Sequence, residues 1–380
     1  MTDTHRTVRI GAAQVAEVYL DREATIEKDC RYIREAGESD IDLLVFPEFH
    51  VAASPYWFQY DDDFDGYQEY YRAMFDNAVE VPGPGTNELS AAATDAGVAV
   101  VVGVNEKKPG TAGTMYNSQV FIDADGSLLG VRRKLVPTRE ERLFHTGGTG
   151  ADIAGFDSSI GTLGGLICGE HTNPLAVYAT LARGEELHAA SWPAMPQPDR
   201  GPEFRERHIY ARTRYHAFAG KVPVASATGV VTDELADAIG GVPETYADSG
   251  TSTVIASDGE FLAGPKWEGE GIVSAEIDMA DRVEGKAYHD VLGHYNRFDI
   301  FRLSVNERPH DPIVVTGGEP TESAADQLGA LGADVSDVDG QRADEIATAL
   351  ETLRNVADRR PDPALADRVA ELEAELDEET

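Results

Sequence analysis

The chain has few cysteines and no long apolar segment. Only two of its 380 residues, Cys30 and Cys168, are cysteine, which excludes a framework of disulfides. No uninterrupted apolar run approaches the roughly 18 residues of a membrane span, and the N-terminal stretch MTDTHRTVRIGAAQ lacks the apolar core of a signal peptide. We therefore expect a soluble, cytoplasmic protein that has no membrane partner.

Positive charge is also scarce. The sequence holds 32 Lys and Arg against 68 Asp and Glu, a formal net charge of −36, and only seven of the basic residues are lysine. So negative a field repels phosphate groups, which excludes nucleic acid as a partner. Acidic, lysine-poor surfaces suit a cytosol at molar salt, where the Debye length falls to about 3 Å. The composition thus indicates a halophilic organism.

Short apolar runs alternate with helical patterns up to about residue 310. The runs at 8–15 and 41–46 are typical of buried strands, and between them Ile26, Cys30 and Ile33 recur at helical spacing, which assigns Cys30 to a core. Eight further runs predict strands, at residues 98–104, 116–123, 127–133, 161–168, 187–191, 222–226, 251–256 and 272–277. The pattern predicts a layered α/β domain over residues 1–310.

The last 70 residues differ in character. Residues 311–380 contain 19 acidic residues and five arginines, with glycine and proline breakers and two helical patterns at 344–356 and 363–376. Such a composition is typical of a solvated segment. We expect an acidic, partly helical C-terminal extension over residues 311–380.

Cys168 ends a glycine-punctuated apolar run. The residues GEHTNP follow it, and then a helical pattern in which Thr172 or Asn173 is the candidate cap and Pro174 suits the first position. This arrangement predicts a sharp strand-to-helix turn at Cys168, close to a helix N-terminus that favours a thiolate. The alternative interpretation is a buried structural cysteine.

Two charged residues also stand at the ends of predicted strands. Glu48 closes the buried run that begins at Ile41, and Lys134 directly follows the run at 127–133. Singly, each is typical of a surface or salt-bridged residue. Together with Cys168 they supply a nucleophile, a base and a cation for developing negative charge, which is what nucleophilic catalysis at a carbon–nitrogen bond requires.

These motifs resemble a known family. Phe46-Pro47-Glu48, Arg133-Lys134-Leu135 and Cys168-Gly169-Glu170-His171 are similar in order and spacing to the Glu, Lys and Cys motifs of the nitrilase (carbon–nitrogen hydrolase) superfamily, over about residues 8–306. Other segments resemble its nitrilase branch, namely 55–57, 174–188, 191–193 and 293–301. The resemblance implies a four-layer αββα sandwich, a homodimer or larger homo-oligomer, and no metal or other cofactor.

The resemblance also implies a reaction. A nitrilase converts an organic nitrile to the carboxylic acid and ammonia, so the implied partner is a small nitrile or amide substrate. Here Glu48 would take the proton of Cys168, whose sulfur attacks the nitrile carbon to give a thioimidate, while Lys134 and the N–H of Gly169 stabilise the charge on nitrogen. A second carboxylate is expected seven residues after Lys134, which is Glu141, with its neighbour in sequence, Glu140, as the alternative.

The residues around the motifs have less certain chemistry. We expect Glu170 to hold backbone N–H groups of the turn, and His171 either to support the nucleophile or to be an ordinary loop histidine. Four residues are predicted to line a substrate pocket, with a plain core as the alternative: Tyr56, Trp57, Trp192 and Met195. No His and Cys residues are spaced closely enough in the sequence to suggest a metal site.

Two other functions stay open at this point. An amidase or carbamoyl hydrolase of the same superfamily would use Glu48, Lys134 and Cys168 on a C(=O)–N bond. A non-catalytic oligomeric scaffold would be expected to have lost at least one of the three residues, and all three are present.

The acidic composition leads to a prediction about salt. We expect the melting temperature and the activity to fall when salt is lowered from molar concentration to 0.1 M, because the Debye length grows to about 10 Å and the charges repel one another. Thermal unfolding and activity at the two salt concentrations test this. Full stability and activity at low salt would show the prediction to be wrong.

Overall fold

The computed structural model describes residues 6–55, 66–194, 206–240 and 250–308. The predictions for Tyr56, Trp57 and Met195, and those for the extension at 311–380, lie outside these residues. Among the helices of the described ranges, none is long and apolar enough to cross a membrane.

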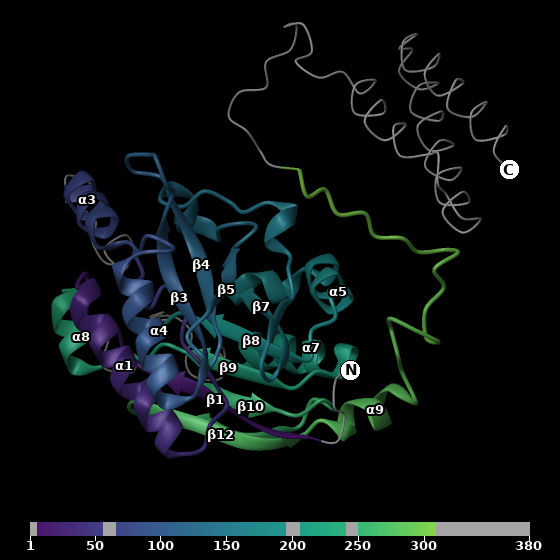
Figure 1. Ribbon diagram of the computed structural model, residues 1–380. Helices are drawn as coiled ribbons and strands as arrows, with labels where there is room; N and C mark the ends of the chain where they lie inside the picture. Colours follow the sequence, from purple (N-terminus) through teal and green to yellow (C-terminus); the bar gives the residue numbers. More distant parts are fainter. Residues whose placement is uncertain (1–5, 56–65, 195–205, 241–249, 309–380) are drawn as a thin grey trace, which may run out of the picture. The chain divides into compact units, whose positions relative to one another are not determined.

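Two six-stranded mixed sheets form the centre of the fold (Figure 1). The first contains, in order, β12 (Gly271–Asp278), β1 (Thr7–Gln14), β2 (Leu43–Val45), β3 (Ala99–Lys107), β4 (Met115–Ile122) and β5 (Leu128–Arg133). The second contains, in order, β11 (Phe261–Lys266), β10 (Ser252–Ile255), β9 (Val224–Thr228), β8 (Leu187–Trp192), β7 (Gly161–Ile167) and β6 (Phe156–Ser158). In each sheet three neighbouring parallel strands, β1–β2–β3 and β7–β8–β9, are flanked by antiparallel ones.

Helices cover the outer face of each sheet (Figure 1). The helices α1 (Arg22–Glu38) and α4 (Pro84–Ala96) pack on the first sheet, and α5 (Pro174–Ala182) and α7 (Ala211–Gly220) pack on the second. The further α-helices of the described residues are α3 (Tyr67–Asn77), α8 (Asp233–Ala238) and α9 (Ala280–Lys286). The predicted four-layer αββα sandwich is thereby confirmed.

Strand β3 shows why the strands read as continuous apolar runs. Val100 and Val102 pack toward α1 and α4, while Ala99 and Val101 pack into the cluster between the two sheets. Both faces of the strand are buried, so the sequence does not alternate between apolar and polar residues. Ten predicted strands are present with ends shifted by a few residues, whereas the short β6 and the half-exposed β11 had no apolar run to reveal them.

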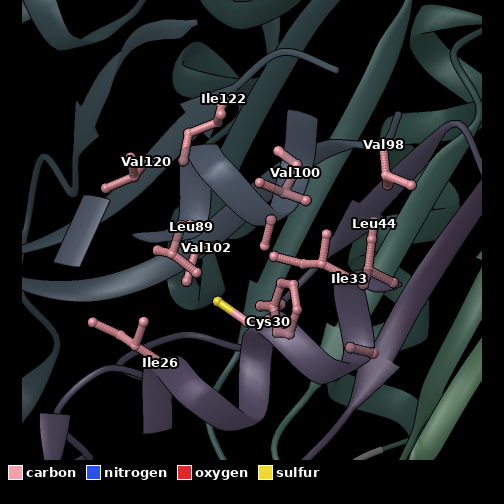
Figure 2. Packing of buried hydrophobic residues seen from close by; sticks show 14 of the residues in the cluster. Ile26, Cys30, Ile33, Leu44, Leu89, Val98, Val100, Val102, Val120 and Ile122 are labelled. Atoms are coloured by element: carbon pink, nitrogen blue, oxygen red, sulfur yellow. The ribbon is translucent and has the colours of Figure 1, made fainter. Parts of the chain in front are cut away.

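Helix α1 carries the predicted apolar stripe. It begins after Asp21, whose side chain accepts the N–H of Ala24 at 2.9 Å and so caps the first turn. Figure 2 shows Cys30 among the aliphatic side chains between α1 and the first sheet, with Ile33 and Leu89 nearby. Burial, with the neighbouring Asp29 as the next cause, raises the pKa of Cys30 to about 11. Cys30 is therefore a buried core cysteine, as predicted.

Candidate active site

The segment after β2 carries Glu48 between the two sheets. The N–H of Phe46 donates to the carbonyl of Val101 on the first sheet at 2.8 Å, and the N–H of Glu48 donates to the carbonyl of Trp192 on the second at 3.2 Å. Gly103 on β3 makes this path possible, because a Cβ there would lie 2.0 Å from the carbonyl oxygen of Pro47. The carboxylate of Glu48 is thus anchored in the buried space where the sheets meet.

A single buried ammonium group joins two carboxylates. Nζ of Lys134 lies 2.6 Å from Oε1 of Glu48 and 2.8 and 2.9 Å from the two oxygens of Glu141, and the Lys134 side chain is 1% exposed. Lys134 directly follows β5, and Glu141 lies on a 3-10 turn at Arg139–Leu143. The amide of Asn117 on β4 donates to the same Glu48 oxygen at 2.7 Å. Four side chains from four segments therefore form one hydrogen-bonded group.

The choice between the two candidate carboxylates is visible in their contacts. Glu141 meets Lys134, whereas Glu140 pairs with Arg139 at 3.1 Å with both side chains partly in solvent. An exposed pair of this kind contributes little to stability. Glu141 is the one whose oxygens the site encloses.

Cys168 lies on the predicted sharp turn. It directly follows β7 and begins a short 3-10 turn that ends at Thr172, after which Asn173 caps α5 by accepting the N–H of Leu175 at 3.0 Å. The backbone of Cys168 has φ +50°, in the left-handed region that costs a non-glycine residue on the order of 1 kcal/mol. Strained strand-to-helix turns of this kind present nucleophiles in other hydrolases.

The charges of the site act on one another. Burial raises the pKa of Glu48 to about 7, although Lys134 acts in the opposite direction. Burial and then the Glu48 carboxylate raise the pKa of Cys168 well above its usual value. Burial alone would lower the pKa of Lys134, but Glu48 and Glu141 outweigh it and the net shift is upward.

Two consequences follow for proton transfer. The Cys168 thiol keeps its proton at rest, because the helix N-terminus that the sequence suggested would favour a thiolate is worth only about 0.3–1 kcal/mol and is outweighed by burial. Glu48, with a pKa of about 7, can accept and release a proton near neutral pH.

Glu170 ties the Lys and Cys segments together. Its carboxylate forms a two-pronged ion pair with Arg132 at 2.6 and 3.0 Å, and it accepts the backbone N–H groups of Leu135 and Ile167 at 2.8 Å each. Both side chains are almost completely buried. One residue thus fixes the chain on either side of Lys134 and immediately before Cys168.

The other predicted residues are placed as follows. His171 is buried, its Nδ1 lies 3.0 Å from the carbonyl of Cys168, and its ring stacks on Trp192 with centroids 5.0 Å apart. Gly169 lies beside Cys168, where a Cβ would come within 3.2 Å of Oγ1 of Thr138.

A cavity of about 110 Å³ opens at Cys168. It is lined by Phe49, Ser54, Pro55, Thr138, Arg139, Glu140, Glu141, Cys168, Pro193 and Ala194. Trp192 is not among the described residues that line this cavity, and its position agrees with the alternative interpretation, a plain core. Trp192 is fully buried in the cluster between the second sheet and α7, and its neighbours Pro193 and Ala194 take the place at the cavity.

Two residues of the site were missed from the sequence. Asn117 contacts Glu48 and Arg132 contacts Glu170, and neither was singled out. For Asn117 the available signal was a polar residue within the fully buried strand β4, since such groups need a partner. For Arg132 there was no such signal, because the rest of β5 is only partly buried.

One group of the described residues has the side-chain types of a metal site. Glu185, His188 and His216 are buried together, with His188 Nδ1 at 2.8 Å and His216 Nε2 at 2.5 Å from the Glu185 carboxylate. Glu185 and His188 are only three residues apart, whereas His216 comes from α7, so sequence spacing gave no sign of the full cluster. Their contacts are hydrogen bonds to one another.

The family model described as carbon–nitrogen hydrolase matches residues 9–287, a range that contains Glu48, Lys134, Glu141 and Cys168. The chain belongs to this family. A relative described as Nitrilase 2, from an unknown prokaryotic organism, is 36% identical to this carbon–nitrogen hydrolase over 315 residues, which is 82% of this chain and 96% of the relative.

An aliphatic nitrilase from Rhodococcus rhodochrous is 33% identical over 361 residues, 90% of this chain and 96% of the relative. Among solved structures, a carbon–nitrogen hydrolase from Helicobacter pylori G27 superposes with a TM-score of 0.60 at 24% identity, covering 75% of this chain and 94% of that chain. The latter likeness bears on the fold alone.

The pKa of Glu48 leads to a prediction for this carbon–nitrogen hydrolase. We expect the rate to fall as pH falls through about 7, because protonated Glu48 cannot accept the thiol proton. Replacing Asn117 by leucine removes a hydrogen bond that lowers the Glu48 pKa, and hydrogen bonds to charged groups are worth about 1.5–3 kcal/mol. The acidic limb of the pH profile of kcat/KM should therefore move up by about one to two pH units.

Asn105→Leu is the matched control for Asn117→Leu. Asn105 is a buried asparagine on the adjacent strand β3 that donates to the carbonyl of Ala53 and contacts His145 instead of Glu48. Its acidic limb should stay in place. An unmoved limb in Asn117→Leu would contradict the role of Glu48 as the titrating base.

Proposed function

We propose that this protein is a nitrilase that hydrolyses an organic nitrile to the carboxylic acid and ammonia, with Cys168 as the nucleophile. The observation that carries the proposal is the buried Lys134 ammonium, which is held by Glu48 and Glu141. The charges of these three residues act on the thiol of Cys168, which lies on a strained turn. The proposal is supported by relatives described as nitrilases that are 32–36% identical over most of both chains.

The first half of the reaction forms a covalent intermediate. Glu48 accepts the proton of Cys168 while the sulfur attacks the nitrile carbon, and one π bond of the C≡N group becomes a lone pair on nitrogen. The nitrogen takes up the proton from Glu48, which returns to its carboxylate form. The product of this step is a thioimidate. Lys134 and the backbone N–H of Gly169 stabilise the negative charge that develops on nitrogen.

The second half uses two water molecules. Glu48 activates the first water, which adds to the thioimidate carbon, and collapse breaks the C–N bond, releasing ammonia and leaving a thioester on Cys168. The second water breaks the C–S bond, which releases the carboxylic acid and restores the thiol. Glu141 holds Lys134 in place and orients the incoming water through the cavity that both Glu141 and Cys168 line.

The test of this function is ammonia release from a panel of nitriles and the matching amides. We expect turnover of nitriles, no turnover by Cys168→Ala with a melting temperature close to that of the wild type, and an acyl adduct on Cys168 by intact-mass spectrometry. Cys30→Ala is the control, because this second cysteine lies in the core against α1. Turnover of amides alone would instead identify an amidase, and activity in Cys168→Ala would refute the mechanism.

We also propose that the protein forms a homodimer or larger homo-oligomer through its second helical layer. Large apolar side chains are exposed there, with Leu175 on α5 60% exposed and Tyr215 and Phe218 on α7 52% and 47% exposed. Exposed apolar groups that gather on one face are typical of protein interfaces.

Light scattering tests the assembly. The wild type should have a multiple of 41.0 kDa, and the double variant Tyr215→Glu/Phe218→Glu should shift toward the monomer, since two charges cannot be buried in an apolar interface. Leu262→Glu, on the edge strand β11, is the control for an added surface charge. A monomeric wild type would refute the proposal.

A further inference from the structure

A second buried cluster of titratable groups reaches the Cys168 turn. It consists of Glu185, His188 on β8, His216 on α7, and His171 of the turn itself. The side chains of Glu185, His188 and His216 are 0% exposed. None of these three takes part in the proposed reaction, so their burial needs another explanation.

The cluster is a continuous chain of contacts that ends on the nucleophile's own backbone. Oε2 of Glu185 lies 2.8 Å from Nδ1 of His188, Nε2 of His188 lies 3.1 Å from Nε2 of His171, and Nδ1 of His171 lies 3.0 Å from the carbonyl oxygen of Cys168. The other Glu185 oxygen contacts Nε2 of His216 at 2.5 Å, and the rings of His188 and His216 stack with centroids 3.6 Å apart.

The directions of these hydrogen bonds are determined from the Cys168 end. A carbonyl oxygen only accepts, so Nδ1 of His171 carries a proton, and the neutral ring then presents a lone pair at Nε2. For the 3.1 Å contact to be a hydrogen bond, Nε2 of His188 must carry a proton as well. If His188 were protonated only at Nδ1, the lone pair on its Nε2 would face the lone pair on Nε2 of His171.

The remaining nitrogen of His188 faces the Glu185 carboxyl group. Either His188 is an imidazolium beside a carboxylate, or it is neutral and accepts a proton from a protonated carboxyl. Both states contain one proton more than a carboxylate beside neutral rings. The extra proton also removes the net charge of a fully buried group, which would otherwise cost several kcal/mol.

The surrounding groups act on His188 in both directions. Burial and then His216 lower the pKa of His188, and together they outweigh the charge and hydrogen bond of Glu185, so that the net pKa of His188 is about 4. The contact with His171 favours the extra proton over a carboxylate beside a neutral His188 protonated at Nδ1, because only a protonated Nε2 completes the contact.

A bound metal ion does not account for the same contacts. Two ligand atoms at about 2.0–2.1 Å from a tetrahedral zinc ion lie about 3.3 Å apart. The contacts of Glu185 with His188 and His216, at 2.8 and 2.5 Å, are shorter and are those of hydrogen bonds.

We propose that Glu185 and His188 hold one shared proton at neutral pH and act, through His171, as positioning residues that fix the carbonyl of Cys168 in its left-handed turn. The inference rests on the proposed role of Cys168 as the nucleophile. If the chain of contacts is broken, the strained backbone of Cys168 relaxes and the sulfur moves. A misplacement of about 1 Å costs on the order of a hundredfold in rate.

Two substitutions of Glu185 test the shared proton. In Glu185→Gln the amide NH₂ donates to Nδ1 of His188 and the amide oxygen accepts from His216, so a neutral side chain reproduces the whole chain of contacts. Glu185→Met has similar size and can form neither bond. We expect Glu185→Gln to stay within about threefold of the wild type, and Glu185→Met to lower kcat by at least about tenfold with little change in KM.

The second readout is the rate at which iodoacetamide alkylates Cys168, followed by peptide mass spectrometry. It needs no nitrile, so it remains informative if the proposed substrate proves wrong. Asp29→Asn is the matched control, since it replaces an equally buried carboxyl group by an amide. Asp29 lies on α1 and contacts Nε2 of His50 at 2.6 Å. Its alkylation rate at Cys168 should equal that of the wild type.

Each other outcome overturns the inference. If Glu185→Gln is as impaired as Glu185→Met, the pair holds no extra proton. If Glu185→Met reacts like the wild type, the cluster does not position Cys168. If the variants fail to fold, ¹H–¹⁵N spectra of the wild type labelled with ¹⁵N-histidine report whether Nε2 of His188 is protonated. The signals of the His188 ring are assigned as those that disappear in His188→Gln. We expect a protonated Nε2 at pH 7, and an unprotonated Nε2 or a stoichiometric metal ion would refute the proposal.

Discussion

The rest of the site depends on the Lys134 ammonium, buried between Glu48 and Glu141. Removing such a charge from water costs several kcal/mol, and only close partners on more than one side repay it. Burial, and after it the second carboxylate of Glu141, raises the pKa of Glu48 to about 7 against the opposing effect of Lys134, so Glu48 can exchange a proton at neutral pH. The same ion pair therefore joins three segments of the chain and acts on the pKa of Glu48, the proposed base.

Buried charged groups held by close partners also surround Cys168. Arg132 and Glu170 form a buried pair that also fixes two backbone N–H groups, and Glu185 with its histidines forms a buried group that reaches the carbonyl of Cys168. Strain at the nucleophile persists because the neighbouring chain is held on both sides. The sandwich provides the setting, since strand ends from both sheets and the turn before α5 meet in one buried space.

Much of the sandwich could be predicted because its central strands are buried on both faces and read as apolar runs. The edge strand β6 is three residues long and β11 is half-exposed, so neither left that pattern. Glu48 and Lys134 were predictable because each is a charged residue at the end of a predicted strand, and Cys168 because helix-cap signals follow the apolar run that it ends. Trp192 lies in a core cluster, and the sequence left both interpretations open because an aromatic residue at a strand end has the same sequence pattern in a core as at a cavity.

The sequence by itself determined the layered fold, the acidic character and the turn at Cys168, because apolar periodicity, charge counts and helix caps are local properties. Only the tertiary structure decided that Glu141 rather than Glu140 forms the ion pair with Lys134, and that Asn117 and Arg132 belong to the site. It alone brought together Glu185, His188 and His216. These contacts join side chains from different segments, and their partners depend on how strands and helices pack, which no local pattern specifies.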